Sequence, residues 1–323
     1  MPKPPPPAMA SYLTPLSQLV PPPAARPWAG ARRVLRAVTF GLVEPGAAAA
    51  IEYERQLVAR VRVRRPEPRV IAFLAGKGGV GTTTTATAVA LTLSTLRQDT
   101  TALISARQGG SSLGERLLGQ PAPPVPAVAE GGPDQAPLWV HNSLAVVDGA
   151  PWHSPVGREP LLRVLDQLRS QHPLTLVDVG NDLGEAAQAA VERADQVVLV
   201  TTVSHDAVTA ARTALSRVHE VDPYRLATVV LAVVCLNPGQ FRRASRRLRQ
   251  ALGLAEARIV PIGFDPWLGN GERMEPAQLR PVTREAYLRI AALVADPGSP
   301  GQWFSPPATA APAGAMRTEG GRW

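Results

Sequence analysis

Residues 76–83 combine glycines and hydroxyl side chains in a pattern suited to binding phosphate. The segment reads GKGGVGTT, follows the apolar run VIAFLA and opens a helical stretch. Closely spaced glycines let consecutive backbone N–H groups turn towards phosphate oxygens, and the helix N-terminus adds partial positive charge. Thr83 stands where the hydroxyl of such a loop binds Mg²⁺. A glycine-rich turn without a ligand is the alternative, but the strand and the helix on either side favour a nucleotide site.

Thr82 replaces the lysine that standard phosphate-binding loops place before this hydroxyl. A threonine cannot neutralise the β- and γ-phosphates, so hydrolysis is predicted to suffer more than binding. Lys77, near the start of the loop, is a second cation. The resulting KGG-x-G pattern resembles the deviant Walker A loop of the MinD/ParA family of P-loop ATPases. The resemblance implies an ATP-dependent homodimer in which Lys77 reaches the phosphates bound by the partner subunit.

Three further segments extend this resemblance. Asp178 lies near the end of LTLVDVG (174–180) and matches the Walker B aspartate, which holds a Mg²⁺-bound water; residues 180–183 would form the switch that follows. Asn237 ends VVCLN, as the adenine-recognising asparagine of the family does, and VPIGFDP (260–266) resembles the loop on the other side of the base. Each match is weak alone, because Asp and Asn at strand ends are often turn or capping residues. Their order along the chain carries the inference.

The resemblance implies ATP and Mg²⁺ as cofactors and assigns roles to individual residues. Lys77 and Asp178 are the candidate catalytic residues, and Thr83 and Asp178 are the candidate metal ligands. The candidate nucleotide-binding residues are Gly76, Lys77, Gly78, Gly79, Val80, Gly81, Thr82, Thr83, Thr84, Asn237, Asp265 and Pro266.

Most of the chain shows a narrower resemblance, carried by SLGERLLG (112–119), by RPVTREAYLRIAALVAD (280–296) and by a basic helical leader. These segments look like the MinD-like proteins that accompany type VII secretion in actinobacteria. The second strand of those proteins usually ends VDANPD, whereas this one ends ISARQG, so Ser105 and Arg107 stand where acidic or amide residues are usual. A cation cannot orient the attacking water as a carboxylate does, so slow hydrolysis is expected. As an alternative, Arg107 supplies the charge that the loop lacks.

Apolar runs alternate with helical stretches from about residue 68 onwards. Runs that are apolar on both faces and separated by helices predict a doubly wound, mostly parallel sheet. The predicted strands are 70–75, 101–105, 143–148, 173–179, 196–202, 228–236 and 258–262. The predicted helices are 82–96, 158–171, 184–194, 206–220, 241–252 and 282–296. The expected fold class is α/β, of the MinD/ParA-like P-loop NTPase type, with a helical N-terminal extension and disordered termini.

Composition indicates how the chain is divided. Proline crowds the first 30 residues, residues 121–126 and the tail, which are predicted to be linkers. The expected parts are a disordered Pro-rich leader (1–27), a basic helical extension (28–66), the nucleotide-binding domain (67–297) and a disordered tail (298–323). The arginines of the extension and of helix 241–252 are interpreted as solvated faces. Docking to an acidic partner, a membrane surface or DNA is the alternative.

The net charge of +8 and the pI of about 10.6 permit binding to nucleic acid, anionic membranes or acidic partners without selecting one. The longest apolar run, 226–236, is too short to span a bilayer, and the single cysteine, Cys235, excludes an internal disulfide. A cytoplasmic location is expected, with peripheral association at the inner face of the plasma membrane as an alternative. Nucleic acid is disfavoured as a partner, because no DNA-reading motif is present and the aromatic content is 5%.

The sequence therefore predicts an ATP-binding, nucleotide-dependent homodimer with slow or partner-stimulated hydrolysis. It would be an accessory to type VII secretion or to protein positioning, with a secretion-machinery or membrane-associated partner. Two alternatives stay open. One is a non-hydrolysing scaffold that keeps the fold as an interaction module. The other is a ParA-like DNA-partitioning protein, favoured only by charge.

Overall fold

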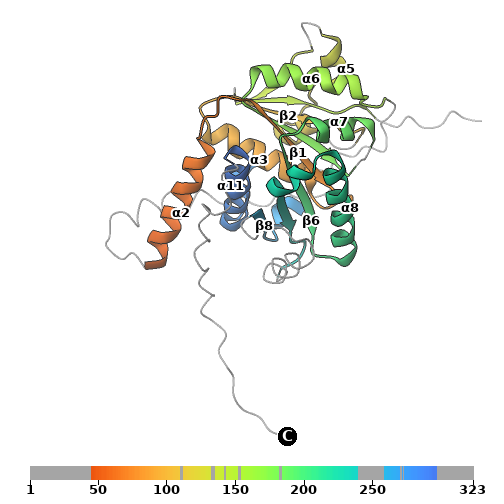
Figure 1. Ribbon diagram of the computed structural model, residues 1–323. Helices are drawn as coiled ribbons and strands as arrows, with labels where there is room; N and C mark the ends of the chain where they lie inside the picture. The colour runs from red at the N-terminus through yellow and green to blue at the C-terminus, as the bar shows by residue number, and fades with distance from the viewer. Residues whose placement is uncertain are drawn as a thin grey trace, which may run out of the picture. The chain divides into compact units, whose positions relative to one another are not determined.

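The computed structural model describes residues 45–109, 112–131, 135–141, 143–151, 154–181, 184–238, 258–269, 271 and 273–296 (Figure 1). The predicted Pro-rich leader, the start of the basic extension, helix 241–252, the end of the switch and the predicted tail lie outside these residues.

An eight-stranded sheet forms the centre of the fold, with the strand order β3-β4-β2-β5-β1-β6-β7-β8. The strands are β1 (Arg69–Ala75), β2 (Thr101–Ser105), β3 (Leu138–Val140), β4 (Leu144–Val147), β5 (Leu174–Gly180), β6 (Gln196–Thr202), β7 (Val230–Val234) and β8 (Ile259–Ile262). Every pair of neighbours is parallel except β3 and β4. The predicted doubly wound, mostly parallel sheet is confirmed. The edge strand β3 was not predicted, because three residues are too few to show a periodicity.

Helices cover both faces of this sheet (Figure 1). Side chains such as Phe73 of β1 point towards one face, and the neighbouring Ala72 points towards the other, because side chains alternate along a strand. On the Phe73 face lie α2 (Pro45–Val61), α3 (Thr82–Leu96), α4 (Leu113–Leu118) and α11 (Pro281–Ala295). On the Ala72 face lie α5 (Val125–Glu130), α6 (Arg158–Gln171), α7 (Glu185–Arg193) and α8 (His205–Val221). Across the described ranges, no helix has both the length and the apolarity that crossing a membrane requires.

The proline-rich segment 121–126 is not a linker, so that prediction is wrong. Pro126 lies in the first turn of α5, where a missing N–H breaks no helical hydrogen bond, and Val125 and Val128 are buried. The carboxylate of Asp148, just after β4, accepts hydrogen bonds from the backbone N–H groups of Leu113 (2.6 Å) and Ala122 (2.9 Å). A buried carboxylate far along the chain therefore orders α4 and the segment that leads to α5, which local sequence patterns do not reveal.

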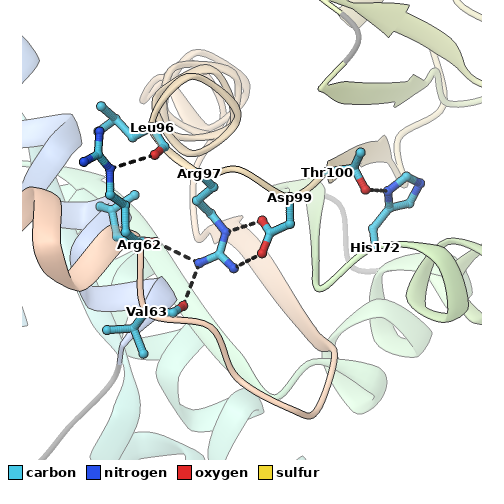
Figure 2. A network of polar contacts seen from close by, with 8 residues as sticks. Arg62, Val63, Leu96, Arg97, Asp99, Thr100 and His172 are labelled. Atoms are coloured by element: carbon cyan, nitrogen blue, oxygen red, sulfur yellow. Dashed lines mark hydrogen bonds and ion pairs between the residues drawn. The ribbon is translucent and has the colours of Figure 1, made fainter.

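Helix α2 packs on the domain through its apolar side. Leu57 and Val61 are buried in the same core cluster as α3 and α11. The chain leaves α2 beside the C-terminal end of α3, where Arg97 holds it (Figure 2). The described part of the predicted basic extension is thus packed against the α/β domain by apolar contacts.

Arg97 joins three segments through a buried guanidinium. Its Nε and Nη2 donate to the two carboxylate oxygens of Asp99, at 2.6 and 2.5 Å, and its Nη1 donates to the carbonyls of Val61 and Val63, at 2.8 and 3.0 Å (Figure 2). The Arg97 side chain is 3% exposed. Four charge-assisted hydrogen bonds therefore compensate its removal from water.

We expect Arg97→Ala to lower the free energy of unfolding by about 3 kcal/mol, because Asp99 and two carbonyls lose their donor. Urea denaturation followed by circular dichroism measures this change. Arg62→Ala is the control, since the Arg62 bond to the Leu96 carbonyl is exposed and its loss is expected to cost less than about 1 kcal/mol. Equal losses in the two variants would contradict the importance of the buried network.

Candidate functional site

The glycine-rich loop joins the end of β1 to the start of α3. Gly79 and Gly81 have φ angles of +75° and +90°, in the left-handed region that glycine adopts without a Cβ penalty. Gly76 packs so closely on α8 that an added Cβ would lie 2.0 Å from the carbonyl oxygen of Ala210. Three of the predicted loop glycines are therefore required by the backbone of this loop.

Thr83 and Asp178 meet behind the loop, as the sheet register dictates. Asp178 of β5 lies opposite Phe73 of β1 on one side and Ser105 of β2 on the other. The Thr83 hydroxyl donates to Asp178 Oδ2 at 2.6 Å, and both side chains are buried. Burial raises the pKa of the Asp178 carboxyl, whereas the Thr83 hydrogen bond and the charge of Arg107 act in the opposite direction. The two residues predicted as metal ligands are thus in direct contact.

Arg107 reaches this pair from the loop after β2. Its Nη1 donates to Thr83 Oγ1 at 2.8 Å. Its side chain passes over Gly180, where an added Cβ would lie 2.7 Å from Arg107 Cδ. The family resemblance marked Arg107 as an unusual residue at its position. The structure places its guanidinium beside the Thr83 hydroxyl.

A second arginine, Arg116 of α4, also faces the start of α3. Its Nη1 donates to Thr84 Oγ1 at 3.1 Å, and its charge interacts with that of Asp178. Sequence reasoning missed a role for Arg116, because the contact joins residues 32 positions apart and α4 is positioned by Asp148. The candidate site therefore has two arginines around one buried carboxylate.

Lys77, near the start of the loop, forms an ion pair with Asp206 at the start of α8. The Lys77 hydrogen bond is the main reason that the pKa of the Asp206 carboxyl lies below its ordinary range. Both side chains are about half exposed, so the pair is screened by solvent and contributes little to stability. Asp206 was not predicted as a site residue, since nothing in the local sequence links it to the loop.

The remaining predicted residues follow the ends of two neighbouring strands, β7 and β8. Val234, the last residue of β7, is 3.7 Å from the Cβ position of Gly81, and Asn237 follows three residues later, exposed. Asp265 follows β8, and its carboxylate accepts from the backbone N–H groups of Trp267 (3.2 Å) and Arg280 (2.8 Å). Pro266 begins α10 (Pro266–Gly269). A small hollow lies between α3 and the segment that follows β8. It is lined by Thr84, Arg116, Trp267, Leu268, Arg273 and Met274.

The predicted switch touches the loop at its start. The side chain of Asn181 lies 3.5 Å from the Cβ position of Gly78, an ordinary van der Waals distance. Residues 182 and 183 lie outside the described residues. The first residue after β5 is thus beside the glycine-rich loop.

The site holds two of the oxygen ligands that Mg²⁺ requires, but a cation lies beside one of them. Thr83 and Asp178 supply oxygen ligands of the kind that Mg²⁺ prefers. Arg107, however, already donates to the Thr83 oxygen that would coordinate the ion. An ion bound to this oxygen would lie within about 5 Å of the guanidinium nitrogen, because Mg–O bonds are about 2.1 Å long. Arg107 therefore occupies one of the two lone pairs of the Thr83 oxygen and brings a positive charge close to an ion at the other, which disfavours Mg²⁺ while Arg107 stays in place. Elsewhere in the described ranges, no cluster of three or more His, Cys, Asp and Glu side chains could hold a metal.

No protein-family model matches the sequence, and no curated protein matches it. Solved structures do match. The cell division ATPase MinD from Pyrococcus furiosus aligns with a TM-score of 0.58 at 16% identity, covering 71% of this chain and 99% of that one. The MinC:MinD complex of Aquifex aeolicus gives 0.55 at 20% identity, covering 70% and 95%. A plasmid partition protein from Borrelia burgdorferi, bound to AMPPNP, gives 0.52 at 16% identity, covering 71% and 98%.

The chain therefore has the fold of the MinD and ParA ATPases. Identities of 20% or less establish likeness of fold, and function has to be argued from the site itself. The fold expected from the sequence is confirmed at this level.

Proposed function

We propose that this protein is a MinD/ParA-like nucleotide-binding protein that takes ATP in the loop 76–83. The observation that carries the proposal is the loop itself, whose two left-handed glycines lead directly into the N-terminus of α3. Such a loop turns its backbone N–H groups towards one point, and the helix N-terminus favours negative charge there. Binding of AMPPNP by the partition protein from Borrelia burgdorferi supports the choice of ATP.

The surroundings of the loop favour a nucleoside triphosphate over a smaller anion. Val234 at the end of β7 lies beside Gly81, and Asn237 follows three residues later. A small hollow lies between α3 and the segment that begins at Asp265. In this proposal Asn237 recognises the adenine, and Asp265 and Pro266 position the backbone on the other side of the base. Calorimetric titration of ATP into the full chain tests the proposal. Saturable binding is expected, and an absence of heat and of competition with a fluorescent ATP analogue would overturn it.

In the same proposal ATP brings two copies together, with Lys77 of each contacting the phosphates bound by the other. Within one chain Lys77 is paired with Asp206, so dimerisation exchanges an exposed ion pair for a contact with phosphate. Because an exposed ion pair contributes at most about 1 kcal/mol, the exchange costs little.

We expect Lys77→Ala to stay monomeric in ATP, because it lacks the cation that bridges the subunits. Asp206→Asn is expected to dimerise at least as well as the parent, because it releases Lys77 from its partner within the chain. Sedimentation velocity with and without ATP measures both. A parent that stays monomeric in ATP, or a Lys77→Ala variant that dimerises like it, would refute this part of the proposal.

We further propose that the protein is an accessory to type VII secretion or to protein positioning, with slow or partner-stimulated hydrolysis. The resemblance of SLGERLLG and of the closing helix to MinD-like proteins of that system supports this role. Deletion of its gene should reduce secretion of the small substrates of that system, and unaltered secretion would argue against the role. A non-hydrolysing scaffold is the second candidate, favoured by Thr82 in the loop and by Arg107 beside Thr83.

A further inference from the structure

We propose that Arg107 takes the place of the divalent cation, so that the site binds the metal-free triphosphate anion. This inference rests on the proposed function, because it concerns the form in which ATP enters the loop. The observation behind it is the 2.8 Å hydrogen bond from Arg107 Nη1 to Thr83 Oγ1, the oxygen that would otherwise be a metal ligand.

The Thr83 hydroxyl both donates and accepts a hydrogen bond within the chain. It donates its proton to Asp178 at 2.6 Å and accepts from Arg107 at 2.8 Å. A hydroxyl has one proton and two lone pairs, and it now presents one of those lone pairs to a guanidinium. Thr83 thus bridges the Asp178 carboxylate and the Arg107 guanidinium, which stands where a metal ion would otherwise contact the Thr83 oxygen.

The backbone holds Arg107 at this position. Its N–H donates to Ser105 Oγ at 3.2 Å, and its carbonyl accepts from the backbone N–H of Ala150 at 3.0 Å. The preceding N–H, of Ala106, donates to the carbonyl of Asp178 at 2.9 Å. The backbone around Arg107 is therefore hydrogen-bonded to β5 and to the segment after β4. These bonds fix the position from which the Arg107 side chain extends.

Two glycines leave the space that this arrangement needs. An added Cβ at Gly149 would lie 1.9 Å from the Arg107 carbonyl oxygen, and one at Gly180 would lie 2.7 Å from Arg107 Cδ. Gly180 also has a φ of +68°, which disfavours other residues. The Arg107 side chain can thus reach Thr83 only because Gly149 and Gly180 have no side chains.

The charges of the site agree with this role. Arg107 and Arg116 both interact with the buried carboxylate of Asp178, so two positive charges lie near the Thr83 oxygen. A second cation at Thr83 would be repelled by both arginines, whereas a free triphosphate would be attracted. A guanidinium also matches phosphate oxygens through several N–H donors, as an ion does through coordination.

The test compares ATP affinity in excess EDTA with ATP affinity in excess MgCl₂, by calorimetry on the full chain. Excess Mg²⁺ converts ATP to its magnesium complex, so a site for the free anion binds more weakly in MgCl₂. For the parent we expect affinity in EDTA to exceed that in MgCl₂. Arg107→Ala should lose about tenfold in EDTA and recover in MgCl₂, reversing the order.

Two further variants make the outcome decisive. Arg107→Gln keeps a long hydrogen-bonding side chain without the charge, and it replaces the alanine variant if that variant does not fold. Arg217→Ala, on the exposed side of α8, removes one arginine far from the loop and should behave as the parent does. Parent affinity in EDTA that is equal to or weaker than in MgCl₂, or an Arg107 variant with the parent's ratio, would overturn the inference. Absence of ATP binding under both conditions would instead overturn the proposed function.

Discussion

The purified protein is expected to hydrolyse ATP about 100- to 1,000-fold more slowly than it would with a lysine at position 82, because the loop lacks a cation at the transferred phosphoryl group. Thr82 is buried at the first position of α3, where its hydroxyl adds no charge. Phosphoryl transfer depends on positioning and on charge stabilisation, so a missing clamp is costly. The corresponding loss of transition-state stabilisation is about 3–4 kcal/mol.

A second alteration acts on the same step. Ser105 lies opposite Asp178 in the sheet register, and its hydroxyl accepts from the backbone of Arg107. It therefore holds the backbone of an arginine instead of presenting a carboxylate to water. Both alterations leave the loop glycines and the Thr83–Asp178 contact in place, so binding should be reduced less than turnover.

Restoring the two groups tests this reasoning. Thr82→Lys together with Ser105→Asp should raise phosphate release more than either change alone, because both groups act on one transition state. Thr82→Met is the matched control, since it has nearly the length of lysine without the charge, and its rate should stay at that of the parent. Turnover near 10 s⁻¹ by the parent alone, an ordinary value for enzymes, would refute the expected defect.

The second large effect is expected at Gly81. Gly81→Val should weaken ATP binding by about 100-fold or more, because a β-branched residue cannot adopt a φ of +90° without strain and would turn the loop N–H groups away from the phosphates. Calorimetry on the full chain measures the change.

Gly131→Val is the matched control for strain. Gly131 has a φ of +73° and a ψ of +126°, and an added Cβ there meets no atom within 4 Å. The variant therefore suffers backbone strain at least as great, at the C-terminal end of α5. It should bind ATP as the parent does. If Gly81→Val also binds like the parent, the nucleotide site is not this loop.

Much of the fold followed from local patterns. The runs around β1, β5 and β6 are apolar on both faces, and each is buried over nearly its whole length, as a central parallel strand requires. The loop was recognisable because its glycines fall between such a strand and a helix. Burial therefore explains why these elements could be predicted.

Contacts between distant segments account for what was not predicted. α4 and α5 depend on the buried Asp148 carboxylate, and prolines beside α5 suggested a linker instead. The Lys77–Asp206 pair and the Arg107–Thr83 hydrogen bond join residues on different elements. A single sequence shows the type of each residue, and the sheet register decides which of them meet.

A single-turnover experiment on the full chain, in which the protein retains ATP on a filter and the retained nucleotide is separated by chromatography at successive times, tests the central claim most directly. The loop is expected to hold ATP and to cleave it at about 0.01–0.1 s⁻¹, which is 100- to 1,000-fold below an ordinary turnover of about 10 s⁻¹. The prediction is retained nucleotide that is recovered mainly as ATP after about one second. No retained nucleotide, or retained nucleotide recovered mainly as ADP within about one second, would contradict it.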